Sequence, residues 1–182
     1  MELVTYVDSL WVLIAGILVM FMQPGFMLVE TGFTRSKNSV NIVMKNFMDF
    51  SVGALTYWAF GFAFAYGGST LGGFIAYGNF FLEGDSSTYF FQVVFAATAA
   101  TIVSGSVAER TKFTSYLLFQ PFICGLIYPI VTHWVWSGQG WLTDLGFVDF
   151  AGSGVVHMVG GFAALAGIQV VGPRIGKFDN EG

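Results

Sequence analysis

The sequence predicts an all-α membrane protein with five transmembrane helices, and three observations support this prediction. Hydrophobic residues make up 55% of the chain and charged residues only 10%, whereas a soluble domain carries about 25% charged residues. Five long apolar runs follow one another, and about 20 apolar residues suffice to cross a bilayer core. All seven Lys and Arg residues fall on one side of the resulting topology.

The apolar runs set the expected helices in order. The first run contains Gln23-Pro24-Gly25, and a kink is expected there because proline removes a backbone donor. No connection between the runs is long enough to hold a soluble domain. The five expected helices cover about residues 10–29, 40–66, 89–107, 113–135 and 150–171.

The basic residues predict an orientation in the membrane. Positively charged residues remain on the cytoplasmic side of a membrane protein. We therefore expect an integral protein of the plasma membrane with its N-terminus outside and its C-terminus in the cytoplasm. The seven basic residues are Arg35, Lys37, Lys45, Arg110, Lys112, Arg174 and Lys177.

Charge and motif content exclude several classes of function. The net charge of −4 and the lack of a basic run argue against a nucleic-acid partner. The single cysteine, Cys124, cannot form a disulfide within the chain. No Cys/His cluster, phosphate-binding loop or nucleophile–base arrangement is present. We therefore expect no metal, no cofactor and no enzymatic activity.

The fifth run carries ionisable residues, and ionisable side chains in a membrane segment are functional candidates. Asp149 can cap its helix, where an anion is favoured, and it can also attract cations. His157 can be a buried structural histidine, or it can line a pore or relay a proton. On one continuous helix the two residues would lie about 12 Å apart along the axis.

Aromatic residues near the outer side are further candidates. Phe91 and Phe95 are four residues apart and share a helix face, so they either pack or stack to close a pore. Trp136 is either an interfacial belt residue or a cation–π wall for a small cation. His133 is expected at the same interface.

We interpret two sets of polar residues on the cytoplasmic side as structural. Lys45, Asn46 and Asp49 share a helical turn and would need partners if buried, so we interpret them as a structural polar cluster. Glu109-Arg110 is interpreted as a solvated turn.

Residues 149–157, Asp-Phe-Ala-Gly-Ser-Gly-Val-Val-His, resemble the signature of the ammonium transporter family, which is related to the Rhesus glycoproteins. Other segments resemble the family in the same order along the chain. These are Pro24-Gly25-Phe26 with Glu30-Thr31-Gly32, Lys37-Asn38 and residues 41–46, residues 91–95 with Ala108-Glu109-Arg110, and residues 133–136.

The resemblance implies an eleven-helix fold made of two inverted five-helix repeats with the pore between them. Residues 1–182 would then be the N-terminal repeat, so the chain looks like a fragment. By the same resemblance, Phe91, Trp136 and Asp149 would form an outer ammonium site. Phe95 would belong to the gate below it, and His157 would be the first of two pore histidines.

The implied function is transport of ammonium, which is selected as the cation and conducted as ammonia. The resemblance also implies a homotrimer in the lipid bilayer and a cytoplasmic PII-type regulator of the full-length protein. Two alternatives stay open: a membrane ammonium sensor coupled to a signalling module, and a haem-binding electron carrier that uses His133 and His157.

Overall fold

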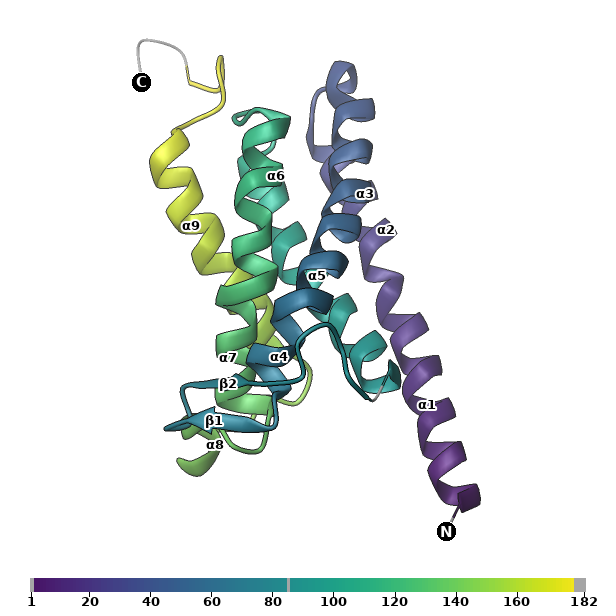
Figure 1. The fold of residues 1–182 in the computed structure, drawn as a ribbon. Helices are drawn as coiled ribbons and strands as arrows, with labels where there is room; N and C mark the ends of the chain where they lie inside the picture. The colour runs from purple at the N-terminus through teal and green to yellow at the C-terminus, as the bar shows by residue number, and fades with distance from the viewer. Residues whose placement is uncertain (1, 85, 179–182) are drawn as a thin grey trace.

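The computed structural model describes residues 2–84 and 86–178, which form five helical passes that run up and down between two ends (Figure 1). The chain begins at one end of this bundle, and its last helix finishes at the other. The helical elements are α1 (Glu2–Met20), α2 (Met22–Phe33), η1 (Ser36–Asn38), α3 (Ser39–Thr56), η2 (Tyr57–Gly61), α4 (Phe62–Tyr66), α5 (Ser86–Val107), α6 (Phe113–Phe122), η3 (Ile123–Ile127), α7 (Tyr128–Trp136), α8 (Trp141–Asp144), η4 (Ser153–Met158) and α9 (Val159–Val171).

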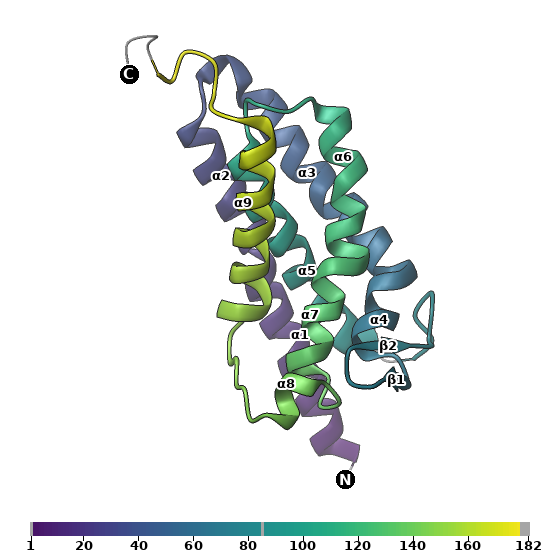
Figure 2. The ribbon, with the colours of Figure 1, turned by 90° about the vertical axis from the view of Figure 1, so that its left-hand side faces the viewer.

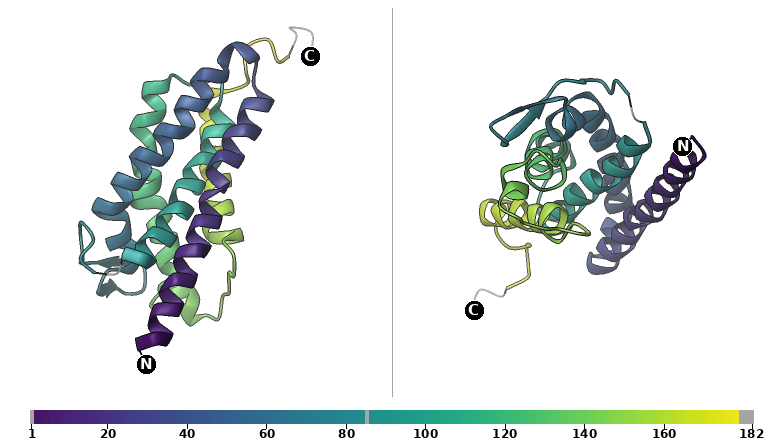
Figure 3. Two further views of the ribbon diagram at one scale, coloured as in Figure 1. Left: turned by 90° about the vertical axis from the view of Figure 1, so that its right-hand side faces the viewer. Right: turned by 90° about the horizontal axis from the view of Figure 1, so that it is seen from below.

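Helix α5 is the centre of the bundle. It packs against α1, α2, α3 and α9, and the turned views show it enclosed by these helices (Figures 2 and 3). Its inner positions are small, which lets the neighbouring backbones approach closely. Ala96, Ala97, Ala99 and Ala100 have no exposed surface.

The outer surface of the bundle is apolar, as expected where lipid replaces water. Large exposed side chains include Leu18, Leu118 and Val170. Among the described residues, four helical stretches are long and apolar enough to cross a membrane: Leu3–Phe33, Ser86–Val107, Phe113–Asp144 and Ser153–Val171. The pass formed by α3, η2 and α4 is not one of them, because polar residues of α3 lower its hydropathy.

The first pass differs from the expected helix in its start and its break. It begins at Glu2 rather than near residue 10, and α1 and α2 are separated at Phe21. Pro24 explains the break, because a proline cannot donate a hydrogen bond to the carbonyl four residues earlier, here that of Met20. The Gly25 N–H instead bonds the Phe21 carbonyl oxygen at 3.2 Å.

Three of the passes contain a π-helical segment, η2, η3 or η4. In the fourth pass the cause is visible in the sequence. Pro129 cannot bond the carbonyl of Gly125, which lies inside η3, so the helix widens there.

The prediction of an all-α chain is wrong in one connection. Residues Ser69–Leu71 (β1) and Ile75–Tyr77 (β2) pair antiparallel, with Thr70 opposite Ala76. The turn between them uses Gly72 and Gly73 at φ +59° and +76°, a conformation that glycine adopts at little cost. The hairpin lies at the end of the bundle where α1 begins (Figure 2).

Candidate functional site

Three of the predicted site residues meet in one aromatic cluster. Phe91 and Phe95 lie on α5, and Trp136 is the last residue of α7. The ring centroids of Phe91 and Phe95 are 5.1 Å apart, and those of Phe95 and Trp136 are 5.7 Å apart, both in edge-to-face geometry. Phe95 is buried, whereas Phe91 and Trp136 are half-buried. The cluster is therefore packed on one side and open on the other.

Asp149 holds the backbone that follows this cluster. Its carboxylate accepts four backbone N–H bonds of 2.8–3.0 Å, from residues 152 to 155. Its carbonyl oxygen accepts a 2.7 Å bond from Trp136 Nε1. Partial burial alone would raise the pKa of Asp149, but the four backbone donors hold this pKa below its ordinary value. The residue thus stays anionic and fixes both the indole and the start of the last pass.

The last pass begins later than its expected start at Phe150. Phe150 is 99% exposed, and η4 begins at Ser153. Gly152 turns the chain at φ +92°, and a Cβ there would lie 2.7 Å from Val156 Cγ2 and 3.2 Å from the Trp136 ring. Asp149 therefore lies in the loop before the helix, so its distance to His157 is not set by one continuous helix.

His157 lies on the open side of the bundle. It belongs to η4, and its backbone N–H bonds the Gly152 carbonyl at 2.9 Å. Its side chain is exposed, and so is Gly161 one turn later, where an added Cβ would have no atom within 4 Å. The structure does not bring His157 into the aromatic cluster. The link between them is indirect: His157 lies on η4, backbone N–H groups of η4 bond the Asp149 carboxylate, and Asp149 bonds Trp136.

The expectation that His133 is interfacial is wrong. Its side chain is 1% exposed. Nδ1 lies 2.9 Å from the Ala65 carbonyl oxygen, and Nε2 lies 2.9 Å from Thr70 Oγ1. Because a carbonyl can only accept, Nδ1 carries the hydrogen and Nε2 accepts from the threonine in the neutral ring. One nitrogen therefore bonds α4 and the other bonds the hairpin strand β1, which removes His133 as a haem ligand.

Glu109 is not a solvated residue, contrary to expectation. Its side chain is 3% exposed, and it forms ion pairs with Arg35 at 3.0 Å and Arg174 at 3.5 Å. Burial opposes ionisation, but hydrogen bonds from Arg35 and Asn38 lower the pKa of Glu109 to about 2. The ion pairs join three connections at one end of the bundle, so the basic loops do lie together.

The expected polar cluster on α3 is buried and larger than predicted. Lys45, Asn46 and Asp49 are at most 6% exposed, and Glu30 of α2 joins them. Asn46 Nδ2 donates to Glu30 Oε2 at 2.7 Å, and the Lys45 ammonium lies 3.7 Å from the same oxygen. Sequence spacing indicates the α3 members, but it carries no sign of Glu30, because only packing places the two helices together.

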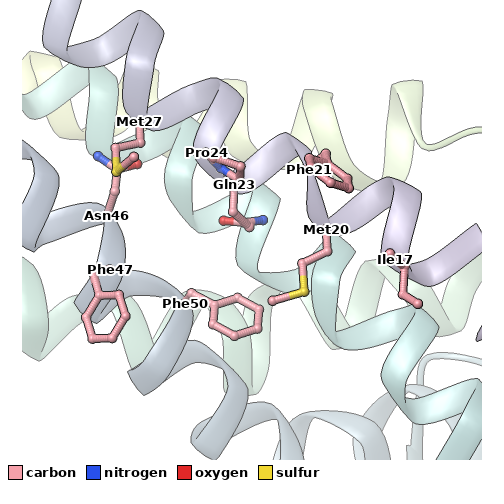
Figure 4. A pocket seen from close by; sticks show the side chains of 9 residues that line it. All are labelled: Ile17, Met20, Phe21, Gln23, Pro24, Met27, Asn46, Phe47 and Phe50. Carbon is pink, nitrogen blue, oxygen red and sulfur yellow. The ribbon is translucent and has the colours of Figure 1, made fainter.

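A groove of about 520 Å³ lies between the first pass and α3 (Figure 4). None of the predicted site residues lines it. Its lining is apolar except for Gln23 and Asn46. The lining residues are Ile17, Met20, Phe21, Gln23, Pro24, Met27, Asn46, Phe47 and Phe50.

Comparison with known proteins gives a consistent result. A sequence model of the Ammonium Transporter Family matches residues 10–182. The chain is 50% identical over 192 residues to the ammonium transporter Amt2 of Archaeoglobus fulgidus, covering 97% of this chain and 41% of that protein. It is 51% identical over 187 residues to a putative ammonium transporter of Synechocystis, covering 97% and 42%.

Solved structures agree with the sequences. A sensor Amt protein superimposes with a TM-score of 0.95 at 40% identity, covering all of this chain and 48% of that one. Candida albicans Mep2 superimposes with a TM-score of 0.84 at 30% identity, covering 92% and 39%. The chain thus spans about two fifths of the length of the curated relatives.

Proposed function

The chain belongs to the ammonium transporter family, whose members are not enzymes, and on this premise we propose that it supplies one wall of an ammonium-conducting pore. The observation that carries the proposal is the half-open cluster of Phe91, Phe95 and Trp136, with Asp149 beside it. This arrangement suits recognition of a small cation, followed by passage of its neutral form.

Cation selection would take place at Phe91, Trp136 and Asp149. An aromatic face attracts a cation by about 0.5–2 kcal/mol, depending on how far the cation is dehydrated. The carboxylate of Asp149 adds a negative potential, but it already accepts hydrogen bonds from four backbone N–H groups. Asp149 would therefore act by orienting Trp136 and by long-range attraction, rather than by direct contact with the ion.

Conduction would proceed past Phe95 to His157. An apolar passage makes a charged species costly, so ammonium would lose its proton before it passes the ring of Phe95. The exposed imidazole of His157 then offers a hydrogen-bonding partner to ammonia. The open face that carries His157 and Gly161 is where a second, inverted repeat would close the pore.

The wider assembly is also part of the proposal. The basic end, where Arg35, Glu109 and Arg174 meet, would face the cytoplasm of a cell with the protein in its plasma membrane. The start of α1 would then lie outside. A homotrimer and a PII-type regulator follow from the family resemblance.

Replacing Trp136 tests this proposal in a protein that contains both repeats. Trp136→Leu removes the aromatic face, and we expect the affinity for ammonium to fall about fivefold, or its selectivity over sodium to be lost. Trp136→Phe keeps an aromatic face while losing the bond to Asp149, so it should retain more of both. Methylammonium uptake with current recorded in parallel gives the measurement.

Trp11 supplies the control. It lies on α1, which contributes none of the proposed site residues, and it is 71% exposed. Trp11→Leu should transport normally. Unchanged affinity and selectivity in Trp136→Leu would assign Trp136 to the interfacial belt. The isolated 182-residue chain should show no uptake, since it forms only one wall.

A second candidate function is ammonium sensing. It is favoured by the likeness to a sensor Amt protein over the whole chain. In this case the same residues would bind ammonium, but the signal would pass to an attached module. A protein that binds ammonium at Trp136 without uptake or current would support the sensor.

A further inference from the structure

Asp49 is a carboxyl group in the interior of the bundle. It follows Ser39 by ten residues, so it lies about 15 Å from the start of α3 along the helix axis. Its exposed fraction is 0%. Oδ2 is 2.6 Å from Thr101 Oγ1, whereas Oδ1 has no hydrogen-bond partner among the described residues.

The charges around Asp49 do not balance it. Lys45 lies one turn earlier, but its ammonium is directed at Glu30 Oε2, 3.7 Å away, and donates to the Ser104 carbonyl at 2.9 Å. No ion pair of the described residues includes Asp49. One lysine therefore faces two buried carboxyl groups, which leaves one excess negative charge if both are ionised.

The remaining neighbours do not supply a positive charge. Tyr116 of α6 and Cys124 of η3 lie near Asp49, and neither side chain can carry a positive charge. Helix α5 contributes Thr101, and Gln120 Nε2 donates to the Asp49 backbone carbonyl at 2.9 Å rather than to its side chain. A buried carboxylate without an ion-pair partner is disfavoured in such surroundings, and the usual outcome is uptake of a proton.

A count of hydrogens at Thr101 leads to the same result. The hydroxyl has one hydrogen, yet its oxygen lies within bonding distance of three acceptors. These are Asp49 Oδ2 at 2.6 Å, the Ala97 carbonyl at 2.9 Å and Gln23 Oε1 at 3.2 Å. If Asp49 carries a proton on Oδ2, it donates to Thr101, and Thr101 is free to donate to Ala97.

We propose that Asp49 is a proton-binding site inside the membrane part of the protein. The carboxyl holds the proton on Oδ2, from which it donates to Thr101 Oγ1. When the site ionises, the O–H bond breaks, its electron pair stays on Asp49 and the proton is transferred to water.

Other polar side chains are buried on α2 and α3. Glu30, Lys45 and Asn46 are buried and contact one another. Gln23 bonds Thr98 at 2.9 Å, three residues along α5 from Phe95. These groups belong to α2, α3 and α5, whereas His157 of the proposed ammonia path belongs to η4.

Infrared spectroscopy of the protein in phospholipid vesicles tests the proposal without reference to transport. We expect a protonated-carboxyl C=O band at near-neutral pH that shifts in D₂O. Asp49→Asn should abolish this band, because the amide has a similar shape but no acid proton. Asp144→Asn, at the exposed last residue of α8, should leave it unchanged. A spectrum of Asp49→Asn identical to the wild type would overturn the proposal.

A second variant keeps the test decisive if Asp49→Asn does not fold. Thr101→Val keeps the size of the side chain but removes the acceptor of the Asp49 proton. The band should remain and move to higher wavenumber, since the carboxyl loses a hydrogen bond. A band that does not move would place the proton elsewhere and overturn the assignment to Asp49.

Discussion

Single polar residues decide the local geometry on both ends of the bundle. Asp149 satisfies four backbone N–H groups that the start of a helix otherwise leaves without partners. A side-chain cap of this kind stabilises a helix by about 0.5–2 kcal/mol. Because the same residue bonds Trp136 through its carbonyl, capping and positioning of the indole depend on one loop.

At the opposite end, Glu109 gives a pH-dependent prediction. The folded pKa of about 2 lies below 4.5, the ordinary pKa of a free glutamate. The stabilisation from Glu109 is therefore complete above about pH 4.5 and is lost as the pH falls towards 2. Thermal unfolding in detergent should show Glu109→Gln less stable than wild type at neutral pH. The difference in unfolding temperature should shrink as the pH falls from about 4.5 towards 2.

The exposed Glu83 provides the control for this series. Glu83→Gln should unfold at the same temperature as wild type at every pH. If the unfolding temperature of Glu109→Gln differs from that of wild type by a constant amount down to the lowest pH, the ion pairs of Glu109 contribute little to stability.

At the scale of elements, the contact between α5 and α9 depends on one glycine. A Cβ at Gly160 would lie 2.8 Å from the Ala99 carbonyl oxygen and 2.8 Å from Ile102 Cβ. Both atoms belong to α5 and neither is the end of a flexible chain. The two helices therefore approach each other only because position 160 has no side chain.

The adjacent glycine offers a matched comparison. Gly160→Ala should force α9 away from α5 and destabilise the chain by about 1–3 kcal/mol. Gly161→Ala meets no atom within 4 Å and should be neutral or stabilising, because alanine favours a helix by up to about 1 kcal/mol. Thermal unfolding of both variants in detergent measures the difference. Equal effects would mean that α9 is free to shift.

At the scale of the whole molecule, the basic residues predict which end faces outward. Ion pairs join Arg35, Glu109 and Arg174, and they follow α2, α5 and α9, whose last residues lie at the end of the bundle opposite the hairpin and the start of α1 (Figure 1). Such a concentration of positive charge at one end is what retention in the cytoplasm requires.

Cysteine labelling of intact cells tests this orientation. With an impermeant maleimide, Ser86→Cys should react from outside and Ser36→Cys should react only after the membrane is opened. Both positions are exposed, and the native Cys124 is fully buried, so background labelling should be low. The reverse pattern would contradict the orientation.

Several features were predictable because they depend on residues close together in the chain. Long apolar runs indicate helices wherever they occur, and the comparisons confirm a mostly helical membrane protein of the ammonium transporter family. The contact of Phe91 with Phe95 follows from a spacing of four on one helix. The inverted repeat and the roles of the site residues stay predictions.

Other features depend on partners far away in sequence. His133 is buried because Ala65 and Thr70 fold back over it. Glu109 is buried because Arg35 and Arg174 reach it from other connections. No local sequence pattern marks either residue as buried. The predictions that His133 is interfacial and that Glu109 is solvated were therefore wrong.

The sequence by itself determined the membrane character, the number of helical passes, the family and the end at which the basic residues lie, since composition, apolar length and short motifs act locally. Tertiary structure decided how Phe95 meets Trp136, how Asp149 caps η4 and how Glu30 and Thr101 meet α3. The physical reason is that hydrogen bonds and ring contacts act over a few ångströms. Only the packing of separate helices around α5 brings these groups within that range.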